Sequence, residues 1–399
     1  MTTSDSVSPA DRAGPLDGVR VVDLSSVIMG PLATQMLADQ GADVIVVETL
    51  AGDPNRAMGP GPRPDLSGTS LNLMRNKRSL AIDLGAEAGR SVLRRLIDTA
   101  DVFVTNLRPG SRRRLGVHAD DLGRDDLVYC AAVGYRSDGP DAELPAYDDI
   151  VQSEIAMPEL SERAGLGPAV SPTLIVDKTV GIVIAQRVAV ALFERERTGR
   201  GTVIDIAMRD VMAGYQLVEH GAASVPQPPL DAPGYGRLLT PFRRPQRTAD
   251  GWIHVLPYER HQFESLFRLA GRPDLCDDER IVDRPARSAH AAELYELVLE
   301  LMPTRTTADW LAVLRDANVP AAALGTIAGL LDELPVAEHP VAGRYRVTPP
   351  LGGERVDVAT IRRHAPLLGA DGPEILAELG VGDAEVDAML RAGVLGAPS

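Results

Sequence analysis

Short apolar runs alternate with longer helical stretches through the first half of the chain. The first repeat is a strand at 19–24, a helix at 31–40 that ends at Gly41, and a second strand at 43–48. The same rhythm returns in apolar runs at 79–84, 101–106, 127–133 and 203–207 and in a helical stretch at 86–100. Strands that alternate with helices of this length predict a parallel sheet covered on both faces. Such sheets bind ligands at the carboxyl ends of their strands.

The pattern changes after residue 220. Proline and glycine are frequent between 221 and 240, which indicates a linker. The pair Asp250-Gly251 then precedes the apolar run 252–255, a signal typical of a β-hairpin. Helical stretches follow at 262–270, 291–302 and 307–317. We therefore expect a second, smaller domain in this part of the chain.

The charge of the chain disfavours several classes of partner. Of the 399 residues, 44% are apolar and 24% charged, and 41 basic against 56 acidic residues give a formal net charge of -15. Such a surface argues against sequence-independent binding to nucleic acid or to anionic membranes. Seven histidines without metal-ligand spacing and only two cysteines, Cys130 and Cys276, predict no metal site and no disulfide framework. Without a secretion signal or a membrane-spanning stretch, we expect a cytoplasmic protein.

The first β-α-β unit ends in Glu48, and an acid at this place contacts the ribose in dinucleotide-binding folds. The turn at 25–31, however, contains Gly30 alone where the phosphate fingerprint needs three glycines. The side chains of Ile28 and Met29 would crowd the space for a pyrophosphate. A redox dinucleotide is therefore disfavoured, and no P-loop motif is present.

Several short motifs follow one another in a fixed order. They are 18–24, Gly30-Pro31, 41–45 with Glu48, 76–79, 106–110, 114–116, Asp177, 197–201 and 250–252. In this order and spacing the chain resembles the family III CoA-transferases, the CaiB/BaiF group, from about residue 15 to its end. The resemblance implies an α/β fold with a Rossmann-like large domain built from both ends of the chain, a small inserted α+β domain and an interlocked homodimer.

Pattern and resemblance together predict five regions. We expect a flexible N-terminus at 1–15, a large CoA-binding domain at 16–220, a linker at 221–240, a small domain at 241–330 and a C-terminal segment at 331–399 that returns to the large domain.

Asp177 precedes an apolar helical stretch that ends at Gly199. Local sequence alone favours an N-cap at Asp177, whereas the resemblance places the catalytic aspartate of the family there. Its carboxylate would attack an acyl-CoA thioester, form a mixed anhydride and then an aspartyl-CoA thioester, and pass CoA to an acceptor acid. The substrates would be an acyl-CoA and a carboxylic acid, with CoA as a substrate moiety and no permanently bound cofactor.

Tyr147 and Asp148 bear on the type of reaction. The resemblance implies that Asp148 assists catalysis across the dimer, and an acid on a surface loop is an equally good interpretation. The α-methylacyl-CoA racemases share this fold and resemble a version with His-Asp here. A tyrosine phenol, with an ordinary pKa of about 10, is a poor base at neutral pH. Racemisation is therefore the second hypothesis, and a CoA-binding protein without catalysis is the third.

The resemblance also implies contacts to CoA, and a cluster of arginines at 108 and 112–114 could hold its phosphates. A solvated run of charges is the alternative interpretation of this cluster. Thr49 and Gly85 stand where the family often has basic residues, and only Gly234 and Gly236 occur where formyl-CoA transferases carry a run of glycines. Formate and oxalate are therefore disfavoured as substrates. The expected CoA contacts are Ile28, Met29, Ile82, Asp83, Asn106, Leu107, Arg108, Arg114 and Tyr147.

Overall fold

The structure, a computed structural model, describes residues 14–353 and 357–396, so nearly all of the lead-in expected at 1–15 lies outside the described residues. The described chain divides into two compact units. The first contains the residues up to Val151, Thr173–Ala213 and the residues from Glu333 onward, and the second contains Gln152–Pro172 and Gly214–Asp332. The expected linker at 221–240 and small domain at 241–330 both fall within the second unit. The boundaries of an inserted domain stay a prediction.

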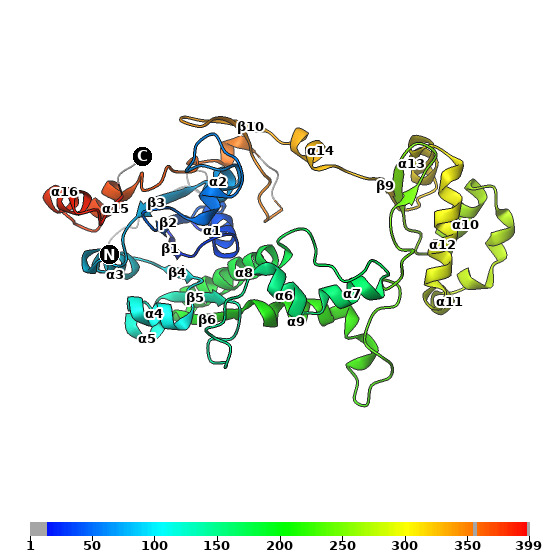
Figure 1. Cartoon of the computed structure of the whole chain (residues 1–399), viewed down its shortest axis with the longest axis horizontal. Coiled ribbons are helices and arrows are strands. Elements are labelled where there is room, and N and C mark those ends of the chain that lie inside the picture. Colours follow the sequence, from blue (N-terminus) through cyan, green and yellow to red (C-terminus); the bar gives the residue numbers. More distant parts are fainter. Residues whose placement is uncertain (1–13, 354–356, 397–399) are drawn as a thin grey trace. The chain divides into compact units, whose positions relative to one another are not determined.

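A six-stranded sheet forms the centre of the first unit (Figure 1). Its strands lie in the order β3-β2-β1-β4-β5-β6, and every neighbouring pair is parallel. The predicted α/β fold with a parallel sheet is thus confirmed. The strands are β1 (Arg20–Leu24), β2 (Asp43–Glu48), β3 (Lys77–Ala81), β4 (Val102–Thr105), β5 (Val128–Val133) and β6 (Thr202–Ala207).

Helices cover both faces of this sheet, which explains why most of its strands are nearly continuous apolar runs. Side chains such as Val22, Ile45 and Phe103 form one core with α3, α15 and α16. Helices α1 and α8 pack against each other and against the sheet (Figure 1). The helices of this unit are α1 (Met29–Asp39), α2 (Gly68–Leu73), α3 (Glu87–Asp98), α4 (Pro109–Leu115), α5 (Ala119–Leu122), α8 (Ile175–Thr198), α15 (Gly372–Glu378) and α16 (Asp383–Arg391).

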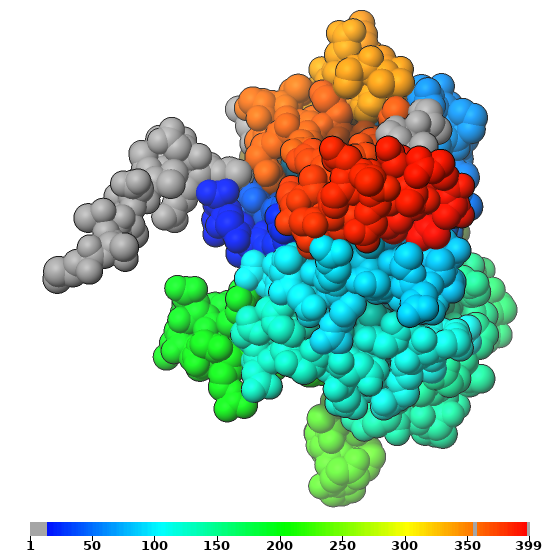
Figure 2. All heavy atoms as spheres, turned by 90° about the vertical axis from the view of Figure 1, so that its left-hand side faces the viewer, coloured from blue at the N-terminus to red at the C-terminus, as the bar shows by residue number. Residues whose placement is uncertain are grey.

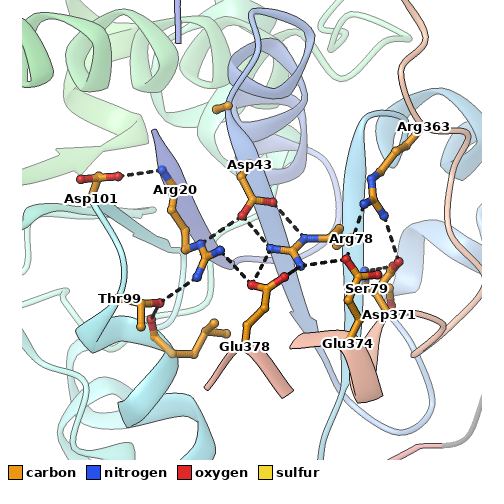
Figure 3. A network of polar contacts seen from close by, with 12 residues as sticks. Arg20, Asp43, Arg78, Ser79, Thr99, Asp101, Arg363, Asp371, Glu374 and Glu378 are labelled. Atoms are coloured by element: carbon orange, nitrogen blue, oxygen red, sulfur yellow. Dashed lines mark hydrogen bonds and ion pairs between the residues drawn. The ribbon is translucent and has the colours of Figure 1, made fainter. Parts of the chain in front are cut away.

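The C-terminal part of the chain lies against the first half of the sheet. Figure 2 shows its red residues in direct contact with the blue and cyan residues of the first third of the chain. In the polar network of Figure 3, Glu378 accepts hydrogen bonds from Arg20 at 2.8 Å and from Arg78 at 2.6 Å. Arg78 also donates to Asp43 at 2.6 Å. Because these three partners lie at the beginning of β1, β2 and β3, the network ties α15 to the amino-terminal edge of the sheet.

The second unit has its own core around Phe263 and Trp310. The expected hairpin is confirmed, since β7 and β8 pair antiparallel across the Asp250-Gly251 turn. Asp250 also accepts the backbone N–H of Thr307 at 2.8 Å and so joins the hairpin to α13. The elements are α7 (Met157–Arg163), β7 (Gln246–Arg247), β8 (Trp252–Val255), α10 (Arg260–Leu269), α11 (Arg284–Ala289), α12 (Ala291–Leu301), α13 (Thr307–Asp316), β9 (Ala321–Ala323) and α14 (Ile327–Asp332).

Two helices, α6 (Asp148–Glu154) and α9 (Met208–His220), cross the boundaries between the units, and a two-stranded hairpin of β10 (Val336–His339) and β11 (Gly343–Arg346) belongs to the first unit. Within the described part of the chain, no helix combines the length and the apolar character that a membrane crossing requires.

The network around Arg78 can be tested by replacing Glu378 with Gln. Because the guanidinium of Arg78 is nearly buried, the loss of one of its three carboxylate partners, Asp43, Glu374 and Glu378, should lower the free energy of unfolding by about 1–2 kcal/mol. Chemical denaturation measures this difference. Asp387→Asn, an exposed change on α16, is the matched control and should stay within about 0.5 kcal/mol of wild type. Equal effects of the two changes would show that the network does not stabilise the fold.

Candidate active site

A pocket of about 340 Å³ opens at the carboxyl edge of the parallel sheet. The strand order reverses between β1 and β4, so the segments that follow these two strands diverge and leave a crevice between them. The volume is in the range of small-molecule sites. The walls are residues 26–29 after β1, residues 106–108 and Ser111 after β4, residues 132–134 and 144–147 around the end of β5, and Asp177 and Met208.

Asp177 reaches this pocket from the first turn of α8. It is the third residue of the helix, and the N-cap position is Leu174, so the interpretation of Asp177 as an N-cap is wrong. The backbone N–H of Asp177 instead donates to Oδ2 of Asp148 at 2.9 Å. The first amides of a helix have no partner within the helix. Asp148, which is almost completely buried, supplies an acceptor for one of them.

Close packing of α8 on α1 brings the two helix starts together. A Cβ atom added to Gly181 would lie 2.8 Å from the carbonyl oxygen of Met29, closer than real Cβ atoms come to other atoms. A glycine one turn after Asp177 therefore allows α8 to approach the first residue of α1. Met29 and Asp177 consequently line the same pocket.

The surroundings of Asp177 disfavour its charged form. Burial and then the negative charge of Asp148 raise the pKa of the Asp177 carboxyl to about 6. At pH 7 the ionised form still dominates, and a more basic carboxylate is a better nucleophile. The ammonium of Lys178 donates to Oγ1 of Thr173 at 2.5 Å, so this neighbouring cation is engaged with the segment before α8.

Seven of the predicted site residues meet in the pocket. Asn106 holds two of the walls together, because its side chain accepts the N–H of Ser26 at 3.2 Å and donates to the carbonyl oxygen of Ser26 at 3.0 Å. The side chain of Tyr147 is 72% exposed at the rim. The predicted residues in the lining are Ile28, Met29, Asn106, Leu107, Arg108, Tyr147 and Asp177.

Three predicted CoA contacts lie outside the pocket lining. Ile82 is fully buried in the core under the sheet. The carboxylate of Asp83 accepts the N–H of Gly85 at 2.8 Å, and the exposed Arg114 donates to Oγ of Ser111 at 3.0 Å. Their contacts with CoA stay predictions.

Not all of the arginines near residue 110 face solvent. Arg112 is buried, and its guanidinium donates to Oγ of Ser137 at 2.8 Å, which gives it a role in the fold. Arg108 lines the pocket and donates to the carbonyl oxygen of Glu143 at 2.6 Å. Of this cluster, Arg108 is therefore the member that the geometry places best for a ligand.

Sequence analysis did not single out Ser26, Val27, Ser111 and Met208, which also line the pocket. The position of residues 26 and 27 after β1 was an available signal, because such positions lie at the ligand edge of a parallel sheet. Ser111 and Met208 carry no such signal. Across the described ranges, no cluster of three or more His, Cys, Asp or Glu side chains is arranged to hold a metal ion.

Comparison with known proteins now identifies the class of this chain. Residues 16–372 match the model of CoA-transferase family III, and the chain belongs to that family. It is 36% identical to the "Probable fatty acyl-CoA transferase" of Mycobacterium tuberculosis over 83% of this chain and 87% of the relative. It is 31% identical to the succinate–glutarate CoA-transferase of Agrobacterium fabrum over 79% of this chain and 82% of the relative. The predicted family and the prediction of a CoA-transferase are confirmed.

A solved structure agrees with this assignment. The crystal structure of a CaiB/BaiF family protein from Brucella suis superimposes with a TM-score of 0.75 at 29% identity and covers 92% of this chain and 99% of that chain. The arrangement of the sheet and of its helices is therefore the one that the family uses.

Asp177→Asn should make the protein more stable at neutral pH. The folded-state pKa of about 6 lies above the ordinary value of 3.8, so ionisation of Asp177 costs stability, and this cost grows from pH 4 to pH 6. We expect a gain of about 1–3 kcal/mol in the free energy of unfolding at pH 7.5 and a smaller gain at pH 5. Denaturation at both pH values measures the gain. The same gain at both would contradict the raised pKa.

Proposed function

We propose that the chain is an acyl-CoA:carboxylate CoA-transferase in which Asp177 forms an aspartyl-CoA thioester. The observation that carries this proposal is the position of Asp177, a half-buried carboxylate with a raised pKa in the pocket at the carboxyl edge of the sheet. Membership of the CoA-transferase family supports it. Names of relatives, such as succinate–glutarate CoA-transferase, support an acyl-CoA donor and a carboxylic acid acceptor.

The proposed reaction needs only groups of the chain and the two substrates. A carboxylate oxygen of Asp177 attacks the thioester carbonyl carbon, and the C–S bond breaks to give an acyl-aspartyl anhydride and CoA thiolate. The thiolate attacks the aspartyl carbonyl carbon, releases the donor acid as a carboxylate and leaves aspartyl-CoA. The acceptor carboxylate repeats these two steps in reverse order and leaves as its CoA thioester, while Asp177 returns to a carboxylate. No net proton is consumed, and CoA is a substrate moiety.

The start of α8 suits this chemistry. Backbone dipoles give a helix start a partial positive charge, which favours the negative charge that develops on the attacked carbonyl oxygen beside Asp177. The carboxylate of Asp148 accepts the backbone N–H of Asp177 and keeps the first turn of α8 in place. We assign Asp148 to positioning Asp177 and to raising its pKa.

A homodimer is part of the proposal. Within the first unit, large apolar side chains are exposed on α8 and on the edge strand β6, namely Val190, Phe193 and Val203. Phe193 is 65% exposed and Val203 is 64% exposed. Apolar side chains gathered on one region indicate a surface that another chain covers. A second copy of this chain is the partner that the family resemblance implies.

The pocket favours transfer over racemisation. A two-base racemase needs a second base near the Cα of the thioester. Among the described residues that line the pocket, the acidic side chains are those of Tyr147 and Asp177, and none is a histidine. With an ordinary pKa of about 10, a phenol is almost entirely protonated at neutral pH. Too little phenolate is then present to act as the base.

Intact-mass spectrometry tests the intermediate. Wild-type protein mixed with a panel of acyl-CoAs should gain the mass of CoA less one water, mapped by peptide analysis to Asp177. Asp177→Asn should lose the adduct and at least about 10³-fold of turnover, since the nucleophile is removed. Asp141→Asn, an exposed acid in the loop after β5, is the matched control and should keep both.

The same mixtures in deuterated water test the second hypothesis. Exchange of deuterium into the Cα position of a thioester without any protein adduct would establish racemisation instead of transfer. Full turnover by Asp177→Asn would remove Asp177 from the mechanism.

The pH dependence of turnover should report Asp177. Only the ionised carboxylate attacks, so kcat should fall as the pH drops through about 6. Asp148→Asn should move this midpoint to lower pH, because the negative charge of Asp148 contributes to the raised pKa. Turnover measured from pH 5 to pH 8 gives both midpoints. A midpoint that does not move in the Asp148→Asn variant would contradict the electrostatic role of Asp148.

A further inference from the structure

Three successive backbone amides of the loop between β1 and α1 each donate to a side-chain acceptor. The loop is residues 25–28, and residues 26–28 together with Met29, the first residue of α1, form one wall of the pocket. The acceptors lie in three separate segments, namely β1, the segment after β4 and the segment after β2, so the loop is held from several sides. The bonds run from Ser25 N to Asp23 Oδ1 at 3.0 Å, from Ser26 N to Asn106 Oδ1 at 3.2 Å, and from Val27 N to both carboxylate oxygens of Asp53 at 3.2 Å each.

The backbone of this loop is strained at Val27. Its φ is +72°, in the left-handed region, which a β-branched residue rarely adopts. Such a conformation persists only where the surroundings hold it, and it is found most often at functional sites. The amide of Val27 is held by Asp53, whereas Ile28 and Met29, which follow directly, line the pocket. The position of these two side chains therefore depends on the hold on Val27.

Asp53 is itself rigidly placed. It is 7% exposed and precedes the 3-10 turn Pro54–Ala57, where its carboxylate accepts the N–H of Asn55 at 2.7 Å. The backbone N–H of Asp53 donates to Oε1 of Glu48 at 3.0 Å, and Glu48 is paired with Arg56 at 2.6 Å. Asp53 is thus anchored to the last residue of β2, and its carboxylate has a fixed direction toward Val27.

The other side of the loop is fixed by different contacts. The fully buried Lys77 donates to the carbonyl oxygen of Pro31 at 2.7 Å and to Thr34 at 2.8 Å, and it pairs with Asp23 at 3.6 Å. A Cβ atom added to Gly30 would lie 2.0 Å from Oγ of Ser25, so the loop approaches α1 as closely as glycine permits. These contacts hold the two ends of the loop, and Asp53 holds its middle.

We propose that Asp53 is a positioning residue that keeps the β1–α1 loop in the conformation that receives CoA. This inference rests on the proposed function, because CoA is taken as the ligand of the pocket. Asp53 does not line the pocket and acts on the ligand through Val27 and the two residues after it. Its contribution should therefore appear in the affinity for CoA.

The charge of Asp53 should make this affinity depend on pH. Burial, and then the negative charges of Glu48 and Asp23, raise the pKa of Asp53 to about 6. The hydrogen bonds that Asp53 accepts from the amides of Asn55 and Val27 lower this pKa, but by less. The other charges that face Asp53 are those of Lys77 and Arg56. Lys77 is paired with Asp23, and Arg56 is paired with Glu48. Protonation below pH 6 weakens both bonds to the Val27 amide, because hydrogen bonds to a charged acceptor are stronger than neutral ones.

Calorimetric titration of CoA into the full-length chain tests this proposal. Asp177→Ala serves as the parent protein, so that titration of Asp177 does not enter the result. Addition of Asp53→Asn should weaken CoA binding about tenfold at pH 7.5, as expected for the loss of a charged acceptor. The difference should shrink at pH 5.5, where Asp53 of the parent is largely protonated. The pH-dependence of the CoA phosphates is common to both proteins and cancels in the comparison.

Asp371→Asn in the same parent is the matched control. Asp371 is also a poorly exposed carboxylate that accepts a backbone amide, that of Ser79 at 2.8 Å. It belongs to the network of Figure 3 and does not line the pocket. This change should leave the affinity for CoA unchanged. Equal losses in the two variants, or no loss in Asp53→Asn at either pH, would overturn the proposal.

Hydrogen exchange without ligand separates this inference from the proposed function. In the Asp53→Asn variant, amides of the peptide that covers residues 25–29 should exchange about tenfold faster than in the parent, because the charged acceptor is lost. In the Asp371→Asn variant they should exchange as slowly as in the parent. If the parent itself binds no CoA, the proposed function fails and this inference fails with it. If the parent binds CoA while Asp53→Asn changes neither exchange nor affinity, the inference alone fails.

Discussion

The hydrogen bond from the Asp177 amide to the Asp148 carboxylate determines both the geometry and the charge of the candidate site. It supplies a partner to an amide of the first turn of α8, and so fixes the direction in which that helix begins. It also places a buried negative charge beside the Asp177 carboxyl, whose pKa is raised first by its own burial and then by this charge. A neutral acceptor could complete the helix start equally well. A carboxylate in this place additionally makes Asp177 more basic, which is the property that a carboxylate nucleophile needs.

The two edges of the sheet are used in opposite ways. At the amino-terminal edge, Glu378 from the C-terminal part of the chain pairs with Arg20 and Arg78 at the starts of β1 and β3, and Arg78 also pairs with Asp43 at the start of β2. At the carboxyl edge, the reversal of strand order leaves a crevice, and polar side chains there bond to backbone amides of the crevice walls. The contacts at the amino-terminal edge pair its charged side chains with one another. The contacts at the carboxyl edge hold the walls of an open pocket in place.

Sequence predicted the strands well where burial is purely apolar, and less well where charge is buried. The start of β3 was missed because Lys77 and Arg78 look like surface residues, while their partners Asp23 and Glu378 lie far away in the sequence. The N-cap interpretation of Asp177 failed for a similar reason, since the acceptor of its amide, Asp148, is 29 residues earlier. Positions after strands, such as Asn106, were predictable because strand ends define the ligand edge. Asp53 follows β2 in a polar loop, and nothing in its local sequence indicates that it reaches Val27.

The same contacts bear on the absence of the glycine fingerprint that dinucleotide sites carry after the first strand of such a sheet. In those sites, free amides after the first strand bind phosphate. Here the amides of residues 25–27 are already bonded, two of them to carboxylates, so they cannot serve a phosphate and the local charge would repel one. The side chains that this loop presents, Ile28 and Met29, are apolar. Under the proposed function, this loop would face the uncharged pantetheine and thioester part of CoA, and the phosphates would need cations from elsewhere. Arg108, which follows β4, is the cation in the pocket lining that would meet this need.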